Sequence, residues 1–375
     1  MSAVELDAGT RKAVRLDSLG LLYHQTVLTV LRLALFVLLL CGAAWPADIT
    51  VGTATARSGQ KATGFIQIPA GVDAATNIAV VVVNGATPGP VLALIAGSHG
   101  TEYASIIALQ KLAQLADPSA LSGALIIVPL VNPASFAQKV PHVNPVDGKN
   151  MNRFYPGKPE GTQTERTSWA ISKQVIEKCD YLIDLHGGDL DENLRRYSYW
   201  ANTGKDSLDN TSSGMVLAFG LDHIIIQDFR SPPANGAVTI TRYASSMGKA
   251  CVTAEAGHAG TTHPEDVDVL IEGSRNVMRH LKMLPGSAAP VEHPLWIGRV
   301  AVLASEQDGV FYPLFGPEAY VKQGMTIGYL TDYFGKRMWD AISPVSGVIV
   351  YIGAVPSMKK GDTIAYIGEL TENPK

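Results

Sequence analysis

Residues 91–102 read VLALIAGSHGTE and carry the strongest structural signal in the chain. The apolar run from Val91 to Ala96 predicts a short buried strand, and two glycines loosen the turn after it. His99 and Glu102 stand three positions apart in this turn, so their side chains can point to the same side. Helical periodicity then runs from Ser105 to Leu115. This order predicts an α/β fold with polar site residues at the end of a strand.

A second histidine of the same kind, His186, follows another apolar run in Asp184-Leu185-His186. Zn²⁺ accepts imidazole nitrogen and carboxylate oxygen, and hydrolytic zinc sites use three protein ligands plus one water. His99, Glu102 and His186 complete such a set, so we expect them to bind Zn²⁺. Asp184 lies two positions before His186, on the same side of the predicted strand, where its carboxylate can orient a ligand histidine.

The composition favours a large folded protein. The chain has 375 residues, of which 46% are hydrophobic and 17% are charged. Such a chain can form one large α/β domain and a smaller one, and its apolar content argues against disorder. The formal net charge is -4, and no basic patch with interleaved aromatic residues occurs, so nucleic acid is not an expected partner. Nothing in the sequence indicates an oligomeric state.

The first 44 residues are typical of a secretory signal peptide. Four basic residues precede an apolar stretch from Leu33 to Leu40, and Gly42-Ala43-Ala44 suits signal peptidase. The apolar stretch is short for a membrane span, so we expect no stable span after cleavage. A retained anchor is the alternative, and Cys41 is poorly placed for lipidation because Leu40 precedes it. We therefore expect a periplasmic or secreted protein.

Strand-like runs alternate with helical patterns in residues 45–285, which we assign to a catalytic domain. The strands are expected at 78–83, 91–96, 124–128, 181–184, 224–226 and 250–254, and the helices at 105–115, 164–178, 238–247 and 264–283. This alternation predicts a mixed sheet with helices on both faces. The segment 133–160 is rich in proline, glycine and asparagine, and a loop of that length is usually functional.

The composition changes after Leu284, where the sequence PGSAAP predicts a linker. Short strands and turns follow, so we expect a small all-β domain over residues 286–375, similar to lipoyl and biotinyl sandwiches. A carrier role needs a lysine at a hairpin tip, but Lys359 and Lys360 fall in the later half of that pattern. We therefore expect a lid. Cys179 and Cys251 lie in or beside buried strands and are expected to be free thiols.

Four segments in this order resemble the succinylglutamate desuccinylase/aspartoacylase family, relatives of the zinc carboxypeptidases. They are GSHGTE at 97–102, DGKNMNRFYPG at 147–157, DLHGG at 184–188 and TAEAG at 253–257. They resemble the first metal motif, the Asn-Arg substrate motif, the second metal motif and the strand that carries the catalytic glutamate. The resemblance covers residues 90 to 370, and it implies a carboxypeptidase-like core and a zinc-dependent hydrolase of amide bonds.

The resemblance also implies roles for individual residues. Glu255 ends an apolar strand, where a carboxylate is costly unless it serves a polar site. We expect it to act as general base toward a metal-activated water and to pass the proton to the leaving nitrogen. Asn152 and Arg153 are the expected substrate-binding residues, because a guanidinium fork can bind a carboxylate through two hydrogen bonds. The implied substrate is a small N-acyl amino acid with a free carboxylate.

The sequence departs from the family in one place. The relatives carry an arginine in the loop after the strand at 124–128, and here residues 131–142 contain none. A tetrahedral intermediate needs a donor or cation besides the metal, and Lys139 and His142 are the two candidates for it. Arg166 also matches a family pattern, and its place at a helix start fits either a structural role or a pocket wall.

Three functions are compatible with these residues. A deacylase of small N-acyl amino acids is the first. The second is a metallocarboxypeptidase that acts on peptides or cell-wall fragments, and the third is an inactive protein that binds an anionic ligand. A β-domain that closes over the metal would exclude a long peptide, so access to the site separates the first two. An intact Glu255 argues against the third, whereas the missing arginine argues for it.

Overall fold

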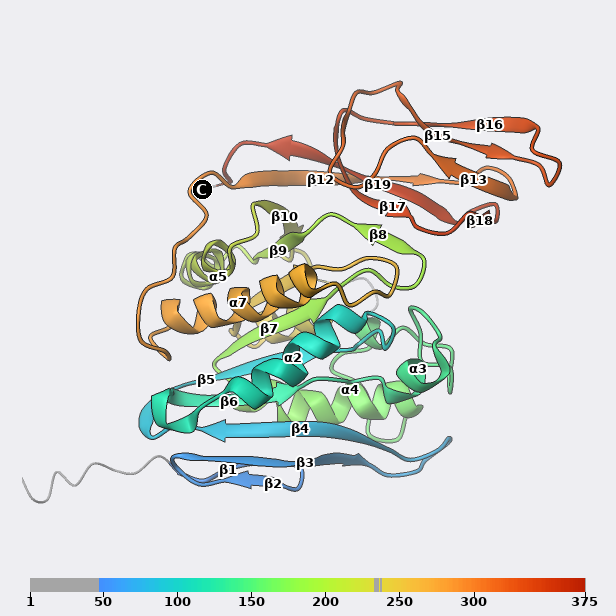
Figure 1. Cartoon of the computed structure of the whole chain (residues 1–375). Helices are drawn as coiled ribbons and strands as arrows, with labels where there is room; N and C mark the ends of the chain where they lie inside the picture. The colour runs from blue at the N-terminus through green and yellow to red at the C-terminus, as the bar shows by residue number, and fades with distance from the viewer. Residues whose placement is uncertain (1–46, 233–235, 237, 375) are drawn as a thin grey trace, which may run out of the picture. The chain divides into compact units, whose positions relative to one another are not determined.

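The computed structural model describes residues 47–232, 236 and 238–374, and the segment Pro46–Lys375 forms one compact unit (Figure 1). The predicted signal peptide lies outside the described residues. Within the described part of the chain, no helix is both long enough and apolar enough to cross a membrane.

A 13-stranded mixed sheet organises this unit. At its centre, strands β11 (Ala250–Glu255), β7 (Tyr181–His186), β5 (Thr87–Ala96) and β6 (Ser122–Val128) lie side by side and run parallel. The next strands are antiparallel to their inner neighbours: β4 (Thr76–Asn84) and then β3 (Gln60–Ile68) beyond β6, and β9 (Tyr197–Asn202) beyond β11. Strand β10 (His223–Asp228) follows β9 in parallel.

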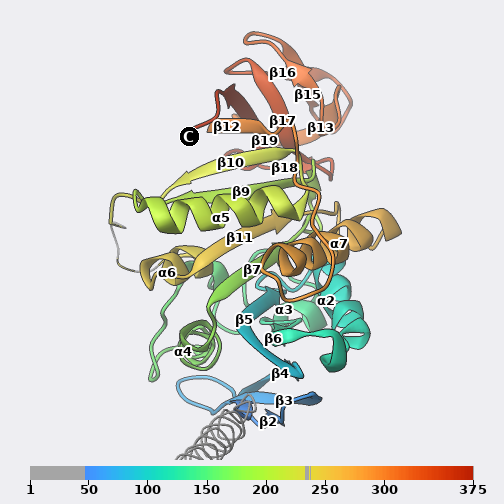
Figure 2. The ribbon, with the colours of Figure 1, turned by 90° about the vertical axis from the view of Figure 1, so that its left-hand side faces the viewer.

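Helices cover both faces of this sheet, as its apolar central strands require. Residues 92–96 of β5 are fully buried, because side chains on both faces of the strand meet helices. Figure 2 shows α2 (Tyr103–Leu115) and α7 (Pro264–His280) on one face, with α4 (Gln163–Gln174) and α6 (Ile240–Ser246) on the other. The expected mixed α/β fold with helices on both faces is therefore confirmed.

Helix α5 (Asp206–Phe219) packs with α2 and α7 in one apolar core, whereas α4 and α6 contribute to a second. The expected strands and helices all occur, with ends that differ by a few residues. Several elements were not predicted, among them α5, β9 and β3. The long segment after Pro133 contains a short helix, α3 (Pro133–Gln138), and a 3₁₀ turn at Met151–Arg153.

Antiparallel strands at the C-terminus extend the main sheet. Strand β12 (Leu295–Ala304) pairs in parallel with β10, and β19 (Thr363–Thr371), β17 (Gly347–Gly353) and β14 (Tyr320–Val321) follow it. A separate four-stranded sheet contains β16 (Arg337–Ile342), β15 (Thr326–Thr331), β13 (Gly309–Pro313) and β18 (Ser357–Met358). These strands enclose an apolar core of their own that includes Phe311, Ile327 and Ile367.

Three small features complete the fold. Strand β8 (Glu192–Leu194) pairs with β17 and so connects the segment after β7 to the C-terminal strands. Strands β1 (Ile49–Val51) and β2 (Ala54–Ala56) form a two-stranded sheet near the start of the described chain. Cys179 and Cys251 are buried and free, as expected.

Candidate metal centre and active site

The candidate site lies where three neighbouring parallel strands end. His99 and Glu102 follow β5, His186 is the last residue of β7, and Glu255 is the last residue of β11. The carboxyl ends of parallel strands lie at one edge of the sheet, which is where open α/β sheets bind ligands. Residues that are far apart in the sequence therefore meet at one place.

His99, Glu102 and His186 form the one cluster among the described residues that could hold a metal ion, with their ligand atoms within 4.8 Å of one another. Nδ1 of His99 lies 2.5 Å from Oε1 of Glu102, and Nδ1 of His186 lies 2.9 Å from its Oε2. Glu102 also stands at the N-terminus of α2. Each histidine thus presents the same nitrogen to one shared carboxylate, which is a suitable donor set for Zn²⁺.

Polar partners hold the other side of both imidazole rings. Nε2 of His186 lies 3.0 Å from Oδ2 of Asp184, and Nε2 of His99 lies 3.2 Å from Oδ1 of Asn150. Hydrogen bonds of this kind orient histidine ligands in metal sites and raise their basicity. Asp184 is 1% exposed, so its carboxylate faces His186 without competing water.

The electrostatics of the cluster suit a cation. Burial alone raises the pKa of Glu102, but His99 and His186 outweigh it and lower the pKa to about 2. Burial by itself lowers the pKa of His186. The carboxylates of Asp184 and Glu102 outweigh burial and raise this pKa well above its usual value. The carboxylate of Glu102 therefore stays ionised, and a positive charge on the buried ring of His186 balances its acidic neighbours.

Glu255 faces this cluster from the adjacent strand. It is the register partner of His186 across the β11–β7 pairing and of Tyr197 across the β11–β9 pairing. Burial is the largest cause of a pKa far above the usual glutamate value, and the carboxylates of Glu102, Glu192 and Asp184 add to it, while His186 opposes it. A carboxyl group in this position is placed to exchange protons near the metal-type residues.

The cluster opens into a cavity of about 210 Å³. Its lining includes His99, Glu102, Asn152, Arg153, His186, Glu192, Tyr197, Tyr199, Gln227, Thr239, Thr241, Thr253, Glu255, Tyr351 and Tyr366. An outer cavity of about 510 Å³ adjoins it and shares His99, Arg153, Glu192, Tyr351 and Tyr366. Since Tyr351 and Tyr366 belong to β17 and β19, the C-terminal strands form part of the wall.

The two expected substrate-binding residues both line the inner cavity, but they differ in burial and in how the protein holds their side chains. Asn152 is buried, its amide oxygen accepts a hydrogen bond from the backbone N–H of Ile240, and its nitrogen lies 3.2 Å from Nε2 of His186. Arg153 is exposed, and its Nη1 donates to the backbone carbonyl of Asn152 at 2.7 Å. Arg153 is thus available to an incoming anion, whereas Asn152 is already held by the protein.

The two candidates for the missing cation lie in different places. Lys139 ends α3, is exposed and lines neither cavity. His142 lines the outer cavity, with its ring centroid 6.5 Å from that of His99. Its Nδ1 lies 3.3 Å from Asp189 and its Nε2 lies 2.9 Å from Asp191, and the bond to Asp191 is the largest cause of a pKa of about 9. His142 thus contributes positive charge, but both ring nitrogens face protein carboxylates.

Arg166 is a structural residue. It is 4% exposed and forms an ion pair with Asp73 at 2.8 Å. Its guanidinium also donates to the backbone carbonyls of Pro69, Asp73, Ala74 and Gly161. The side chain therefore fastens the loop after β3 to α4 and lines neither cavity of the site.

Sequence reasoning missed several cavity residues that the fold supplies, among them Glu192, Tyr351 and Tyr366. Glu192 is on β8, and Tyr351 and Tyr366 are on C-terminal strands that reach the site only through β-sheet pairing. The sequence offered one signal for the tyrosines, which is their place on strand-like segments of the predicted lid. For Glu192 the sequence offered only an acidic run, which alone indicates a solvated loop.

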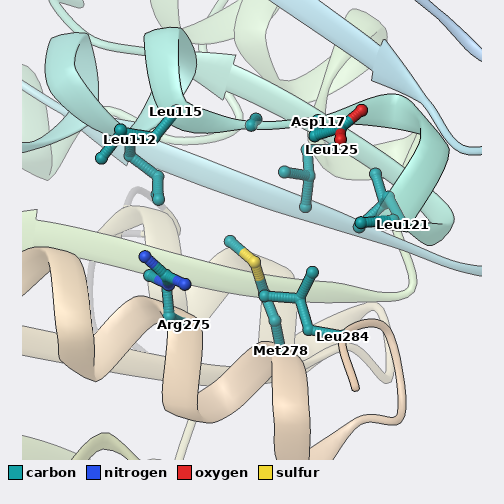
Figure 3. A pocket seen from close by; sticks show the side chains of 10 residues that line it. Leu112, Leu115, Asp117, Leu121, Leu125, Arg275, Met278 and Leu284 are labelled. Carbon is teal, nitrogen blue, oxygen red and sulfur yellow. The ribbon is translucent and has the colours of Figure 1, made fainter. Parts of the chain in front are cut away.

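A separate cavity, of about 200 Å³, lies between α2 and α7, away from the three candidate metal ligands (Figure 3). Leu112 and Leu115 approach it from α2, and Arg275 and Met278 approach it from α7. Its lining is mainly leucine, with Asp117 and Arg275 as the charged side chains. Its described lining residues include no histidine and a single carboxylate, so the strand-end site is the candidate active site.

Comparison with known proteins identifies the family of this chain. The model of the succinylglutamate desuccinylase/aspartoacylase catalytic domain matches residues 88–281, which is more than half of the chain and includes His99, Glu102, His186 and Glu255. The chain is also 29% identical over 327 residues to the N-alpha-acetyl-L-2,4-diaminobutyric acid deacetylase of Halomonas elongata, a match that covers 83% of this chain and 92% of that protein.

Solved structures with the same fold include two bacterial proteins. One is the product-bound ectoine utilization protein EutE (DoeB) from Ruegeria pomeroyi, with a TM-score of 0.75 and 24% identity over 82% of this chain and 95% of that one. The other is a succinylglutamate desuccinylase/aspartoacylase from Rhodobacter sphaeroides, with a TM-score of 0.76 and 22% identity over 88% of this chain and 99% of that one.

Proposed function

Because the chain belongs to the succinylglutamate desuccinylase/aspartoacylase family, we propose that it is a zinc-dependent deacylase of small N-acyl amino acids. Hydrolysis of an amide bond is the activity that both the family and the deacetylase from Halomonas elongata support. One observation carries the finer proposal, which is that His99, Glu102 and His186 converge beside Glu255 in a single cavity.

The residues present fit a zinc ion. Two imidazole nitrogens and one carboxylate are the ligands of many hydrolytic zinc sites, and here all three lie within 4.8 Å of one another. Asp184 and Asn150 hold the rings from behind, as outer partners do in metal sites. A bound Zn²⁺ would act as a Lewis acid that makes water a stronger nucleophile near neutral pH.

Glu255 supplies the proton transfers in this proposal. Its carboxylate accepts a proton from the attacking water while the new carbon–oxygen bond forms. It then delivers that proton to the amide nitrogen as the carbon–nitrogen bond breaks, so the amine leaves neutral and the acyl group leaves as a carboxylic acid. Burial, together with the nearby carboxylates of Glu102, Glu192 and Asp184, raises the pKa of Glu255, and a higher pKa makes its carboxylate a stronger base for the first transfer.

Arg153 binds the free carboxylate of the substrate. Its guanidinium is exposed where the inner cavity meets the outer one, and it lines both. A guanidinium can hold a carboxylate through two parallel hydrogen bonds and so fix the amide relative to the metal-type residues. The amide group of Asn152 contacts both the backbone N–H of Ile240 and Nε2 of His186, and it thereby fixes the backbone next to Arg153.

The shape of the cavity favours a small substrate over a peptide. Tyr351 and Tyr366 wall the inner cavity from the C-terminal strands, and its volume is about 210 Å³. A metallocarboxypeptidase needs a long open groove for the chain that precedes the scissile bond. We therefore place the deacylase first, with the C-terminal strands as a fixed lid, and we retain the periplasmic or secreted location as part of the proposal.

A hydrolysis assay tests the proposal. The full chain is treated with a chelator, reloaded with Zn²⁺ and offered N-acetyl and N-succinyl amino acids beside a panel of dipeptides. We expect release of amino acid from the acyl substrates only in the presence of metal. Activity on dipeptides alone would support the peptidase, and zinc binding without turnover of either panel would support an inactive binding protein.

A further inference from the structure

Glu192 occupies an unusual position in the candidate active site. It begins β8, where it is the register partner of Gly353 on β17, and its side chain lines both the inner and the outer cavity. Its Oε2 accepts a hydrogen bond of 3.0 Å from the backbone N–H of Asp189. One carboxylate oxygen is thereby fixed by the protein, and the other is left for the cavity.

Glu192 lacks a permanent cation of its own. Among the described residues, neither lysine nor arginine forms an ion pair with it, and the nearby cationic ring of His142 is itself paired with Asp189 and Asp191. Burial and the carboxylate of Glu102 raise the pKa of Glu192 to about 7. A half-buried carboxylate in such surroundings gains a large part of its stabilisation when a positive group binds next to it.

The charged residues that line the two cavities also favour a positively charged ligand group. Five carboxylates line them, which are Glu102, Asp191, Glu192, Glu255 and Asp362. Arg153 is the single lysine or arginine among the described lining residues, and the cationic ring of His142 already faces Asp189 and Asp191. One substrate carboxylate can pair with Arg153, but a second would meet the acidic groups without a guanidinium or ammonium partner. A substrate with two carboxylates is therefore a poor electrostatic match.

We propose that Glu192 is a specificity-determining residue that binds a protonated amine on the substrate, and that the substrates are N-acyl amino acids with a cationic side chain. This inference rests on the proposed deacylase function and narrows its substrate class. The amino acid carboxylate pairs with Arg153, the amide lies at the metal-type cluster, and the side-chain ammonium group pairs with the free oxygen of Glu192. The two charged ends thereby fix the direction in which the substrate binds.

Three matched ligands test the proposal on the full chain. Nα-acetyl-L-2,4-diaminobutyrate carries an ammonium group, Nα-acetyl-L-norvaline replaces that group with a methyl group of similar size, and Nα-acetyl-L-glutamate carries a second carboxylate. We expect kcat/KM to fall in that order for the unaltered protein. In Glu192→Gln the preference for the cationic ligand over norvaline should fall by about 30-fold, as for loss of one partner of a partly buried charge pair.

Two further variants separate recognition from structure. In Glu192→Gln the new amide oxygen can still accept the Asp189 N–H, so β8 should keep its place. Glu192→Asp retains the charge and should recover part of the preference for the ammonium ligand. Glu160→Gln removes an exposed carboxylate outside the cavities and should leave both the rates and the preference unchanged.

Calorimetric binding of the same three ligands to the metal-free protein provides a readout that needs no turnover. Tighter binding of the diaminobutyrate ligand that is lost in Glu192→Gln would support the assignment even if hydrolysis failed, in which case only the proposed function would fall. An equal loss for all three ligands in Glu192→Gln, or a preference of the unaltered protein for acetylglutamate, would overturn the role of Glu192 while leaving a deacylase activity intact.

Discussion

Glu255 and His186 are register partners on the adjacent parallel strands β11 and β7. The pairing places the proposed base beside a proposed metal ligand through backbone hydrogen bonds, which do not depend on the rotamer of either side chain. Such rigid support is what proton transfer in a preorganised site requires. The backbone pairing of β11 with β7 therefore fixes the position of the proposed base.

Glu255→Gln should keep zinc and lose turnover. The amide has nearly the same shape as the carboxyl group but cannot accept the proton from water, so kcat should fall by about 10²–10⁴-fold. The measurement is the rate on N-acyl amino acids, with zinc content determined on the same sample. Glu265→Gln, in an exposed part of the first turn of α7, is the matched control. Loss of zinc or an unaltered rate would remove Glu255 from the role of base.

Arg153→Ala should raise the Michaelis constant for substrates with a free carboxylate. The substrate carboxylate would lose its pairing partner, whereas the metal-type cluster would be untouched. The check is a comparison of each substrate with its carboxamide analogue, for which the substitution should have little effect. Arg57→Ala removes an exposed arginine that lines neither cavity. It should leave the Michaelis constants of the acid and of the carboxamide unchanged. An equal effect on the acid and the carboxamide would contradict the assignment.

Asp184→Asn should weaken zinc binding. The buried carboxylate lies 3.0 Å from Nε2 of His186, and loss of such an outer partner typically lowers metal affinity by about 10–100-fold. Competition with a zinc-binding dye measures the affinity directly. Asp206→Asn, at an exposed position in α5, is the control. Unchanged affinity would show that Asp184 serves the fold and not the metal.

Zinc should stabilise the folded chain. Because the three ligands come from two separate segments of the sequence, the unfolded chain holds no preformed site and binding favours the folded state. At a free zinc concentration 100 times the dissociation constant, the gain is about 2.7 kcal/mol in unfolding free energy. Thermal unfolding with and without metal measures it. His186→Ala should abolish the difference, and a gain that persists in that variant would point to a different metal site.

The cap of α4 should make stability depend on acid pH. Glu165 accepts hydrogen bonds from Lys149 at 2.9 Å and from the backbone N–H of Thr162 at 3.0 Å, and these lower its pKa to about 2. Because the folded pKa lies below the usual value of 4.5, the contribution is full above that pH and is lost as the pH falls towards 2.

Glu165→Gln should therefore cost roughly 1–2 kcal/mol of unfolding free energy near neutral pH, and less as the pH falls from about 5 to about 2. Urea unfolding at several pH values tests this, with Glu160→Gln as the exposed control. A cost that did not change with pH would indicate that the carboxylate charge is not the source of the stability.

Much of the site could be predicted from the sequence because its residues sit at the ends of apolar strands. The runs before His99, His186 and Glu255 are buried on both faces, and such strands are visible as continuous hydrophobic stretches. Parallel strands deliver their final residues to one edge, so the grouping followed from the fold class. The position of Asp184 behind His186 followed from the two-residue repeat of a strand.

Helix α5 escaped prediction because its buried face is partly polar. Asp209, Ser212 and Ser213 are all buried, and Asp209 caps the backbone at Thr203 and Gly204. These side chains hide the apolar period that normally marks a helix. Strand β9 escaped for a related reason, since Tyr197 and Trp200 are buried but do not alternate with polar residues in a simple way.

Glu192 could not be found from the sequence because its environment depends on a distant strand. Locally it is part of an acidic run, and only the pairing of β8 with β17 turns it towards the cavity. The same holds for Tyr351 and Tyr366, which reach the site through the order of strands in the sheet. Long-range pairing is not encoded in any local window of residues.

The parallel pairing of β12 with β10 ties the C-terminal strands into the same hydrogen-bonded sheet that carries the candidate active site. An outward rigid-body movement of those strands would break the hydrogen bonds of this pairing and of the β8–β17 pairing. We therefore expect substrates to enter and products to leave through the outer cavity while these strands stay in place. Exchange of this kind is fast, so bond cleavage, rather than a slow hinge, is expected to set the pace of each cycle.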